Sequence, residues 1–165
     1  MSDTTKNADV SDREAILANF EATRAAYHEL LGSLSEEDWR HKSGNAGWTV
    51  GQLLWHIAWG AGYFPQGVEA CRKGKAPNPP AWLMNPLNLL ITRIGSRNAT
   101  PLSVGDKYDA AHAAILACLD GVQDGEWQMG VTAFGRYTTI AGTFQRFRDH
   151  FEEHEADIRK GLGRS

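Results

Sequence analysis

The stretch from Ile140 to Ile158, IAGTFQRFRDHFEEHEADI, decides the fold of this 165-residue chain. Large apolar side chains recur along it at steps of four and three residues, a spacing that places them on one face of an α-helix. His154 falls on the same face, where an aliphatic residue would be expected, and His150 lies one turn before it. We therefore predict a long amphipathic helix that carries two histidines beside the core.

A second segment with the same periodicity covers residues 12–33. Ser11 and Glu14 have the spacing of a capping box, in which the two side chains bond to each other's backbone N–H groups. We predict that a helix starts after Ser11 and ends near Gly32, and that residues 1–10 form a disordered tail. The side chains on its mostly apolar face are Ile16, Phe20, Thr23, Tyr27, Leu30 and Leu34.

The polar segment 35–48 is predicted to be a loop, and the clearest helix start in the chain follows it. Thr49 and Gln52 form a second capping box. Apolar residues at helical spacing continue from there to Val68. Pro65 is expected to kink or shorten this helix, because proline removes a backbone hydrogen bond and clashes with the preceding turn.

The middle of the chain holds a proline-rich connector, 75–80, and signals for two more helices. Asn85–Pro86 has the pattern of an N-cap followed by a first helical residue, so a short helix is predicted over 86–95. A third long helix is predicted to start within Ser103–Asp106. The segment 120–137 is rich in glycine and aromatic residues, and we interpret it as a loop or a loose hairpin.

These elements predict an all-α fold, a four-helix bundle with a long connection carrying a short extra helix. No convincing strand is present. With 165 residues, of which 42% are hydrophobic and 22% charged, the chain is sufficient for one such domain. We place that single domain at residues 11–165.

Charge and hydropathy argue against several classes of partner. The formal net charge is -3 with no basic stripe, which argues against nucleic acid. No apolar run approaches the roughly 20 residues of a transmembrane helix, and the polar N-terminus does not have the layout of a signal peptide. We therefore expect a cytoplasmic protein that binds neither nucleic acid nor membranes. Cys71 and Cys118 are expected to be reduced structural thiols.

His56, His150 and His154 are the candidate metal ligands. Residues four apart on a helix share a face, so the imidazoles of His150 and His154 can converge, and His56 lies well inside the helix that follows Thr49. Burying an imidazole without a partner costs on the order of 1–3 kcal/mol. A divalent metal would satisfy all three rings and keep open positions, as in a catalytic zinc site, with nickel, iron or manganese as alternatives. The competing interpretation is ordinary hydrogen bonding, which we assign to His28, His41 and His112.

The segment Trp48–Ala58, WTVGQLLWHIA, together with His150-x-x-x-His154, resembles the DinB-like family of four-helix metalloproteins over nearly the whole chain after residue 10. The resemblance implies that His56, His150 and His154 bind a divalent metal. It also implies the chemistry of transferases and isomerases that use a low-molecular-weight thiol cosubstrate, such as mycothiol or bacillithiol. Other members are described only as metal-dependent hydrolases. The family often forms homodimers, so a homodimer is expected here.

Trp59, Tyr63 and Arg146 are candidate pocket residues. Trp59 and Tyr63 follow His56 on the same side of its helix and could form aromatic walls, and Arg146 could bind a substrate carboxylate. The alternative is that the two aromatic side chains pack in the core or in a dimer interface and that Arg146 is solvated.

The reaction stays open between two routes. Three neutral histidines leave the charge of a divalent metal uncompensated, which favours an anionic ligand such as hydroxide, thiolate or carboxylate. The catalytic group is therefore a metal-bound water in a hydrolase or a metal-bound thiolate in a thiol S-transferase. Either enzyme would act on a small-molecule substrate. The alternative from another class is a non-catalytic dimeric or small-ligand-binding bundle, in which the metal is structural or absent.

Overall fold

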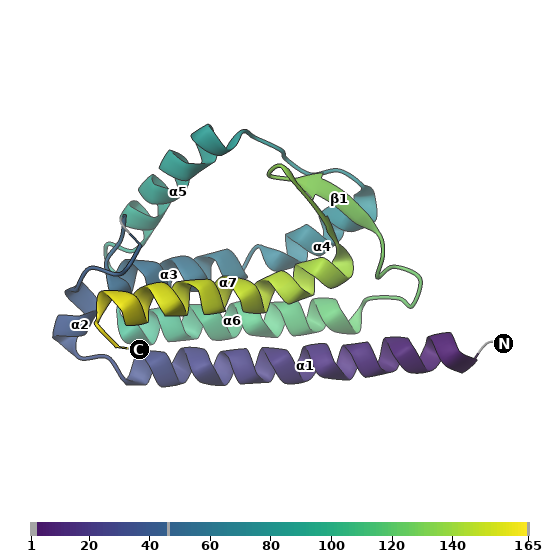
Figure 1. Cartoon of the computed structure of the whole chain (residues 1–165), viewed down its shortest axis with the longest axis horizontal. Helices are drawn as coiled ribbons and strands as arrows, with labels where there is room; N and C mark the ends of the chain where they lie inside the picture. The colour runs from purple at the N-terminus through teal and green to yellow at the C-terminus, as the bar shows by residue number, and fades with distance from the viewer. Residues whose placement is uncertain (1–2, 46, 165) are drawn as a thin grey trace.

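The computed structural model describes the backbone of residues 3–45 and 47–164. Figure 1 shows long helices lying along one another, with α5 and a β-hairpin rising from the same side of the bundle. The main helices of the bundle are α1 (Asp3–Gly32), α3 (Val50–Ala61), α6 (Pro101–Asp120) and α7 (Ile140–Gly161). The shorter elements are α2 (Glu36–Arg40), α4 (Phe64–Lys73), α5 (Ala81–Gly95), β1 (Gly130–Ala133) and β2 (Arg136–Thr139). The predicted all-α bundle with an extra helix in a long connection is confirmed.

The predicted apolar faces meet in one core. Helices α1 and α3 each pack against both α6 and α7. Tyr27 stacks on Tyr108 with ring centroids 3.9 Å apart, and Phe20 lies edge-on to Phe147 at 4.9 Å. Each of these side chains is at most 2% exposed, and burying one contributes about 1.5–3 kcal/mol. Aromatic packing therefore holds α1, α6 and α7 in place around the site.

The predicted start of α3 is confirmed. The Thr49 side chain accepts a hydrogen bond from the backbone of Gln52, and the Gln52 side chain accepts one from the backbone of Thr49. Helix α3 ends at Ala61, and α4 begins at Phe64 with Pro65 in its first turn. Proline is well tolerated in a first turn because its missing N–H would have no intrahelical partner there. Pro65 was expected to kink or to shorten the predicted helix, and it shortens it.

Two predicted starts of long helices are wrong. Helix α1 begins at Asp3, within the segment that we predicted to be a disordered tail, so Ser11 lies inside the helix and does not cap it. Helix α6 begins at Pro101, where Thr100 and Ser103 cap each other's backbone. A capping pattern in the sequence is only a local preference, and an uninterrupted helix overrides it at Ser11.

The predicted start of the short helix is also wrong. Helix α5 begins at Ala81, before the expected cap at Asn85, and Pro86 lies inside it. Pro86 cannot donate to the carbonyl of Trp82 one turn earlier. Both residues are exposed, so water can bond to that carbonyl. An exposed helix can therefore keep a proline that would disrupt a buried one.

Both predicted loop segments contain regular structure. The segment 35–48 includes α2, which starts at a capping box formed by Ser35 and Asp38. The segment 120–137 leads into the antiparallel pair β1–β2, so the hairpin interpretation is the right one. Its turn residues Phe134 and Gly135 have φ values of 51° and 76°, as in a type I′ turn.

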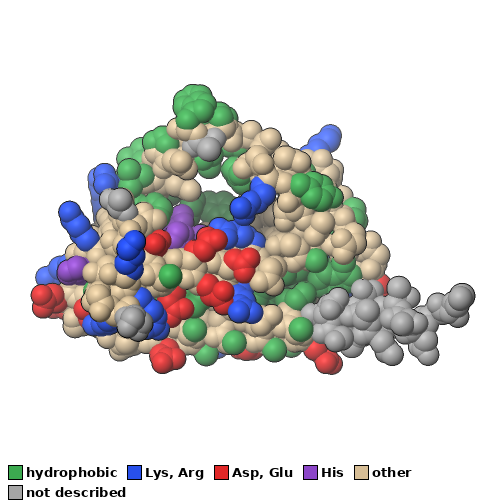
Figure 2. Space-filling model, viewed as in Figure 1, with side chains coloured by type: hydrophobic (Ala, Val, Ile, Leu, Met, Phe, Trp, Pro, Cys, Tyr) green, Lys and Arg blue, Asp and Glu red, His purple; other side chains and the backbone are tan. Residues whose placement is uncertain are grey.

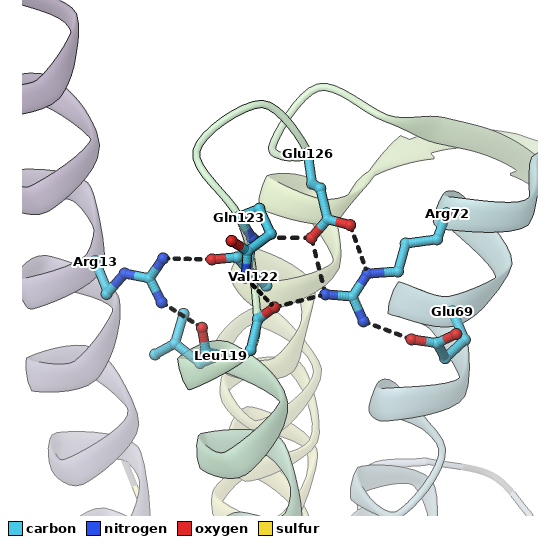
Figure 3. A network of polar contacts seen from close by, with 8 residues as sticks. Arg13, Glu69, Arg72, Leu119, Val122, Gln123 and Glu126 are labelled. Carbon is cyan, nitrogen blue, oxygen red and sulfur yellow. Dashed lines mark hydrogen bonds and ion pairs between the residues drawn. The ribbon is translucent and has the colours of Figure 1, made fainter.

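Two arginines tie the segment after α6 to the bundle (Figure 3). Arg13 on α1 donates hydrogen bonds to the carbonyls of Leu119 and Val122. Leu119 belongs to the last turn of α6, whose carbonyls lack intrahelical donors. Arg72 on α4 donates to both carboxylate oxygens of Glu126. These contacts fix the chain that leads into the hairpin against α1 and α4.

Candidate metal centre and adjoining pocket

Three histidines from two helices converge in the bundle. His56 lies on α3, and His150 and His154 lie one turn apart on α7. The ring centroids of His150 and His154 are 4.8 Å apart, and those two rings lie 5.4 and 5.2 Å from His56. One nitrogen from each ring lies within 4.8 Å of the other two. The convergence depends on the helical spacing in α7 and on the packing of α3 against it.

Neighbouring polar groups orient two of the rings. Nδ1 of His56 lies 3.2 Å from the hydroxyl of Thr92, a fully buried residue of α5. Nδ1 of His154 lies 3.3 Å from the carboxylate of Asp157. With Nδ1–H donating in each case, Nε2 is free to bind a metal, which is the usual arrangement of metal-ligating histidines. The indole of Trp48 stacks on His56 at 4.6 Å and covers one side of that ring.

Burial keeps the imidazoles neutral. It lowers the pKa of His56 from 6.5 to about 4 and that of His150 from 6.5 to about 3, because the charged forms lose hydration. Burial also lowers the pKa of His154, against the opposing effect of the Asp157 carboxylate. Neutral imidazole is the form that binds a metal. The site is therefore ready to bind one at neutral pH without losing protons.

The donor set fits a divalent transition metal. Imidazole nitrogen suits zinc, nickel, copper and iron. Among the described residues, no fourth His, Cys, Asp or Glu joins the three histidines. A structural zinc normally has four protein ligands, whereas a catalytic zinc has three and keeps an open position. The arrangement can therefore hold a metal in the way that catalytic sites do.

The other three histidines lie outside the cluster. Nε2 of His28 lies 2.8 Å from the carboxylate of Asp109, and His41 is exposed. His112 is 5% exposed, with its Nε2 3.6 Å from the carboxylate of Glu21. Within the described part of the chain that nitrogen makes no hydrogen bond, but the ring does bond to the backbone of Phe20, so the ordinary hydrogen bonding that we predicted for His112 is present in part.

A pocket of about 740 Å³ adjoins the cluster, between α4, α7 and the hairpin. Figure 2 shows histidine side chains in a hollow between α5 and the hairpin. Gly60 lines the pocket and also lies against His150, since a Cβ atom at Gly60 would be 3.0 Å from Cε1 of that ring. Gly60 thus separates the pocket from the histidine cluster.

Two of the three predicted pocket residues line this pocket. Tyr63 and Arg146 are part of its wall, whereas Trp59 is not and packs against Trp55 and Tyr63. Arg146 is not a free cation, because its guanidinium makes two hydrogen bonds, of 2.7 and 2.9 Å, to the carboxylate of Glu153. It is therefore a weaker candidate for binding a substrate carboxylate than the sequence indicated.

Comparison with known proteins identifies the family. The family model of the DinB superfamily matches residues 19–158. The chain belongs to the DinB superfamily. Its fold is similar to that of mycothiol-dependent maleylpyruvate isomerase and of a variant of that enzyme with a histidine replaced by alanine. Their TM-scores are both 0.70, at 17% and 18% identity, over 88% of this chain. The chain spans 60% of the length of those structures, and identity this low shows a shared fold alone. No curated protein matches the chain.

Several residues at the site of this DinB-superfamily chain were not predicted. Asp157 could have been found, because it follows His154 by one turn on the same helix face. Thr92 reaches His56 from α5. Phe134 and Arg136 reach the pocket from the hairpin. Thr92, Phe134 and Arg136 belong to segments that long connections join to the bundle. Sequence periodicity does not predict where such segments pack.

Replacing Gly60 by alanine is expected to weaken metal binding without weakening the fold. The added Cβ would lie 3.0 Å from Cε1 of His150, so that ring must move by a few tenths of an ångström. Alanine raises helix propensity by about 0.8–1.0 kcal/mol relative to glycine. We expect the zinc affinity to fall about tenfold, as when a ligand loses its orienting partner, with an unchanged or higher melting temperature. Calorimetric zinc titration measures the first effect. Gly105→Ala on α6, with no contact closer than 3.4 Å, is the control, and equal zinc affinities in all three proteins would contradict the prediction.

Proposed function

We propose that this protein is a metal-dependent enzyme that acts on a small molecule, with His56, His150 and His154 as ligands of a divalent metal. The observation that carries the proposal is the convergence of three imidazole nitrogens within 4.8 Å of one another. Two further facts support it. The adjoining pocket of about 740 Å³ is in the size range of small-molecule sites, and the DinB-like family that the sequence resembles contains metal-dependent enzymes.

The chain's own residues prepare the site. Thr92 and Asp157 hold the rings of His56 and His154 so that their Nε2 atoms are free, and Trp48 shields His56 from water. When bound, the metal supplies Lewis acidity and lowers the pKa of a water molecule or thiol. Zinc is the metal that we propose, and nickel, iron and manganese are the alternatives.

Thiol transfer is the reaction that we favour over hydrolysis. The solved structures of similar fold belong to an enzyme that depends on mycothiol. Neither cysteine of the chain belongs to the histidine cluster, and burial raises the pKa of both Cys71 and Cys118. A nucleophilic thiol would therefore come from a low-molecular-weight cosubstrate. Its thiolate would also offset the charge that three neutral ligands leave on the metal.

Metal analysis of protein purified without a His-tag, followed by titration with zinc, tests the proposal. We expect about one zinc per chain. The loaded protein should then consume free thiol when glutathione or mycothiol is supplied with an electrophile, and the metal-free protein should not. If zinc, nickel, iron and manganese all fail to bind, the proposal is wrong. Metal-dependent turnover that proceeds without any added thiol would favour a hydrolase instead.

The expectations about location and macromolecular partners stay predictions. Across the described residues, every helix is too short or too polar to cross a membrane. The homodimer that the family resemblance implies, and the expected lack of nucleic-acid binding, can be measured together. Sedimentation velocity of the protein alone and with duplex DNA should give a dimer in both cases and no complex with the DNA. Cytoplasmic location can be measured by cell fractionation.

A further inference from the structure

The tip of the β1–β2 hairpin holds a residue in an unfavourable backbone conformation. Phe134 has a φ of 51°, in the left-handed region that L-residues avoid because Cβ crowds the following carbonyl. Asn, Asp or Gly usually occupies the first position of such a turn. The Phe134 side chain is 60% exposed, so packing in the core does not compensate for the strain. Strained residues of this kind gather at ligand clamps and other functional sites.

The strained tip is held at the pocket. Phe134 lines the pocket together with Tyr63 and Tyr137, which gives the pocket aromatic walls. The backbone N–H of Gly135 donates a 2.5 Å hydrogen bond to Oδ1 of Asn78, in the connector before α5. The tip is therefore anchored by a second segment of the chain as well as by its own strands.

The same hairpin supplies a second arginine to the pocket wall, which also helps to lower the pKa of the Glu153 carboxyl. Arg136 is the first residue of β2, lines the pocket and makes no ion pair with any described residue. Arg146 also lines the pocket, but it is paired with Glu153 and holds the pKa of that carboxyl below its usual value. Asp149 on α7 is the acidic residue of the wall and accepts a hydrogen bond from Gln145. An anion would therefore be attracted to the hairpin side of the pocket.

We propose that the hairpin is a ligand clamp and that the pocket binds a small anion with an aromatic or other apolar body, such as an arylcarboxylate or arylsulfonate. Arg136 binds the anionic group, and Phe134 covers the apolar body. Because Gly60 belongs to the pocket wall and also touches His150, a ligand held there lies beside the histidine cluster. The inference that such an anion is the substrate rests on the proposed function. The inference that the pocket binds such an anion does not require a metal.

Two dyes of similar shape and different charge test the clamp. 8-Anilinonaphthalene-1-sulfonate carries a sulfonate, and N-phenyl-1-naphthylamine is neutral; the fluorescence of both rises in apolar sites. Arg136→Gln is expected to weaken binding of the sulfonate about tenfold, which corresponds to about 1.4 kcal/mol, and to leave binding of the neutral dye within about twofold. Arg97→Gln is the control, because Arg97 is not part of the pocket wall and lies one turn after Ile94, an exposed apolar residue of α5. This variant should bind both dyes as the unmodified protein does. No binding of the sulfonate by the unmodified protein, or an equal loss for both dyes, would overturn the proposal.

Phe134→Asn separates strain from binding. Asn-Gly is the preferred pair for a type I′ turn, so this variant is expected to melt about 2–4 °C higher than the unmodified protein. The same variant loses the aromatic cover and should bind both dyes several-fold more weakly. A lower melting temperature, or unchanged binding of both dyes, would contradict the clamp.

Zinc titration of the same variants distinguishes the clamp from the proposed function. Arg136→Gln and Phe134→Asn should take up zinc with the affinity of the unmodified protein. If no metal binds to any of them and the dye results hold, the proposed function fails and the clamp stands. If zinc binds and the sulfonate dye does not respond to Arg136→Gln, the clamp fails alone.

Discussion

Replacing His154 by alanine is expected to lower the zinc affinity by at least about a hundredfold. Loss of a group that merely orients a ligand costs ten- to a hundredfold, and this change removes a ligand itself. The helix should survive, because alanine has the highest helix propensity. Asp157, the partner left behind, has a side chain that is 33% exposed and can be hydrated. Calorimetric zinc titration and far-ultraviolet circular dichroism measure the two effects.

His112→Ala is the matched control for this prediction. His112 is buried and His154 half-buried, but His112 lies on α6 outside the cluster and meets the Phe20 ring edge-on at 6.4 Å. Its truncation is expected to lower the free energy of unfolding by about 1–3 kcal/mol and to leave the zinc affinity unchanged. Loss of zinc binding in His112→Ala, with binding kept in His154→Ala, would show that the ligands are assigned wrongly.

The metal-free protein is expected to lose at least about 2 kcal/mol of stability when the pH falls from about 6.5 to about 5.5, since His56 and His150 account for about that much and burial also lowers the pKa of His154 and His112. In the unfolded chain His56 and His150 have the ordinary pKa of 6.5, and folding lowers these values to about 4 and about 3. The folded protein therefore binds fewer protons than the unfolded chain. Stability is complete above the unfolded pKa and falls as the pH drops toward the folded values. Each of the two histidines contributes about 1 kcal/mol in this window.

Urea unfolding of chelator-treated protein at the two pH values measures this loss. His150→Leu removes one titrating group and keeps an apolar side chain, so its loss should be smaller by about 1 kcal/mol. His112, whose pKa burial also lowers, is present in both proteins and cancels from the comparison. A stability that stays constant across the window would mean that water reaches the imidazoles, which contradicts a buried cluster.

Features that depend on neighbours within one or two helical turns were predictable. The spacing of His150 and His154, and the capping box that starts α3 before His56, are of this kind. Helix starts were less predictable, since Asn85–Pro86 has a capping pattern but lies inside α5. Whether a proline interrupts a helix depends on the surroundings of the carbonyl that it leaves unbonded, and those surroundings are set by packing.

By itself, the sequence determined the helices of the bundle and the shared face of His150 and His154, because helical periodicity is a local property that links residues a few positions apart. His56 joins them through the packing of α3 against α7. Only the tertiary structure decided the surroundings of those histidines. Thr92 is brought to His56 across a long connection. Glu153 pairs with Arg146, whereas Arg136 lines the pocket without an ion pair to any residue that the structure describes. Phe134 has its positive φ at the turn that joins the paired strands β1 and β2. Such contacts join segments that are far apart in the sequence. Helical periodicity does not predict them, because they depend on how the helices and the hairpin pack.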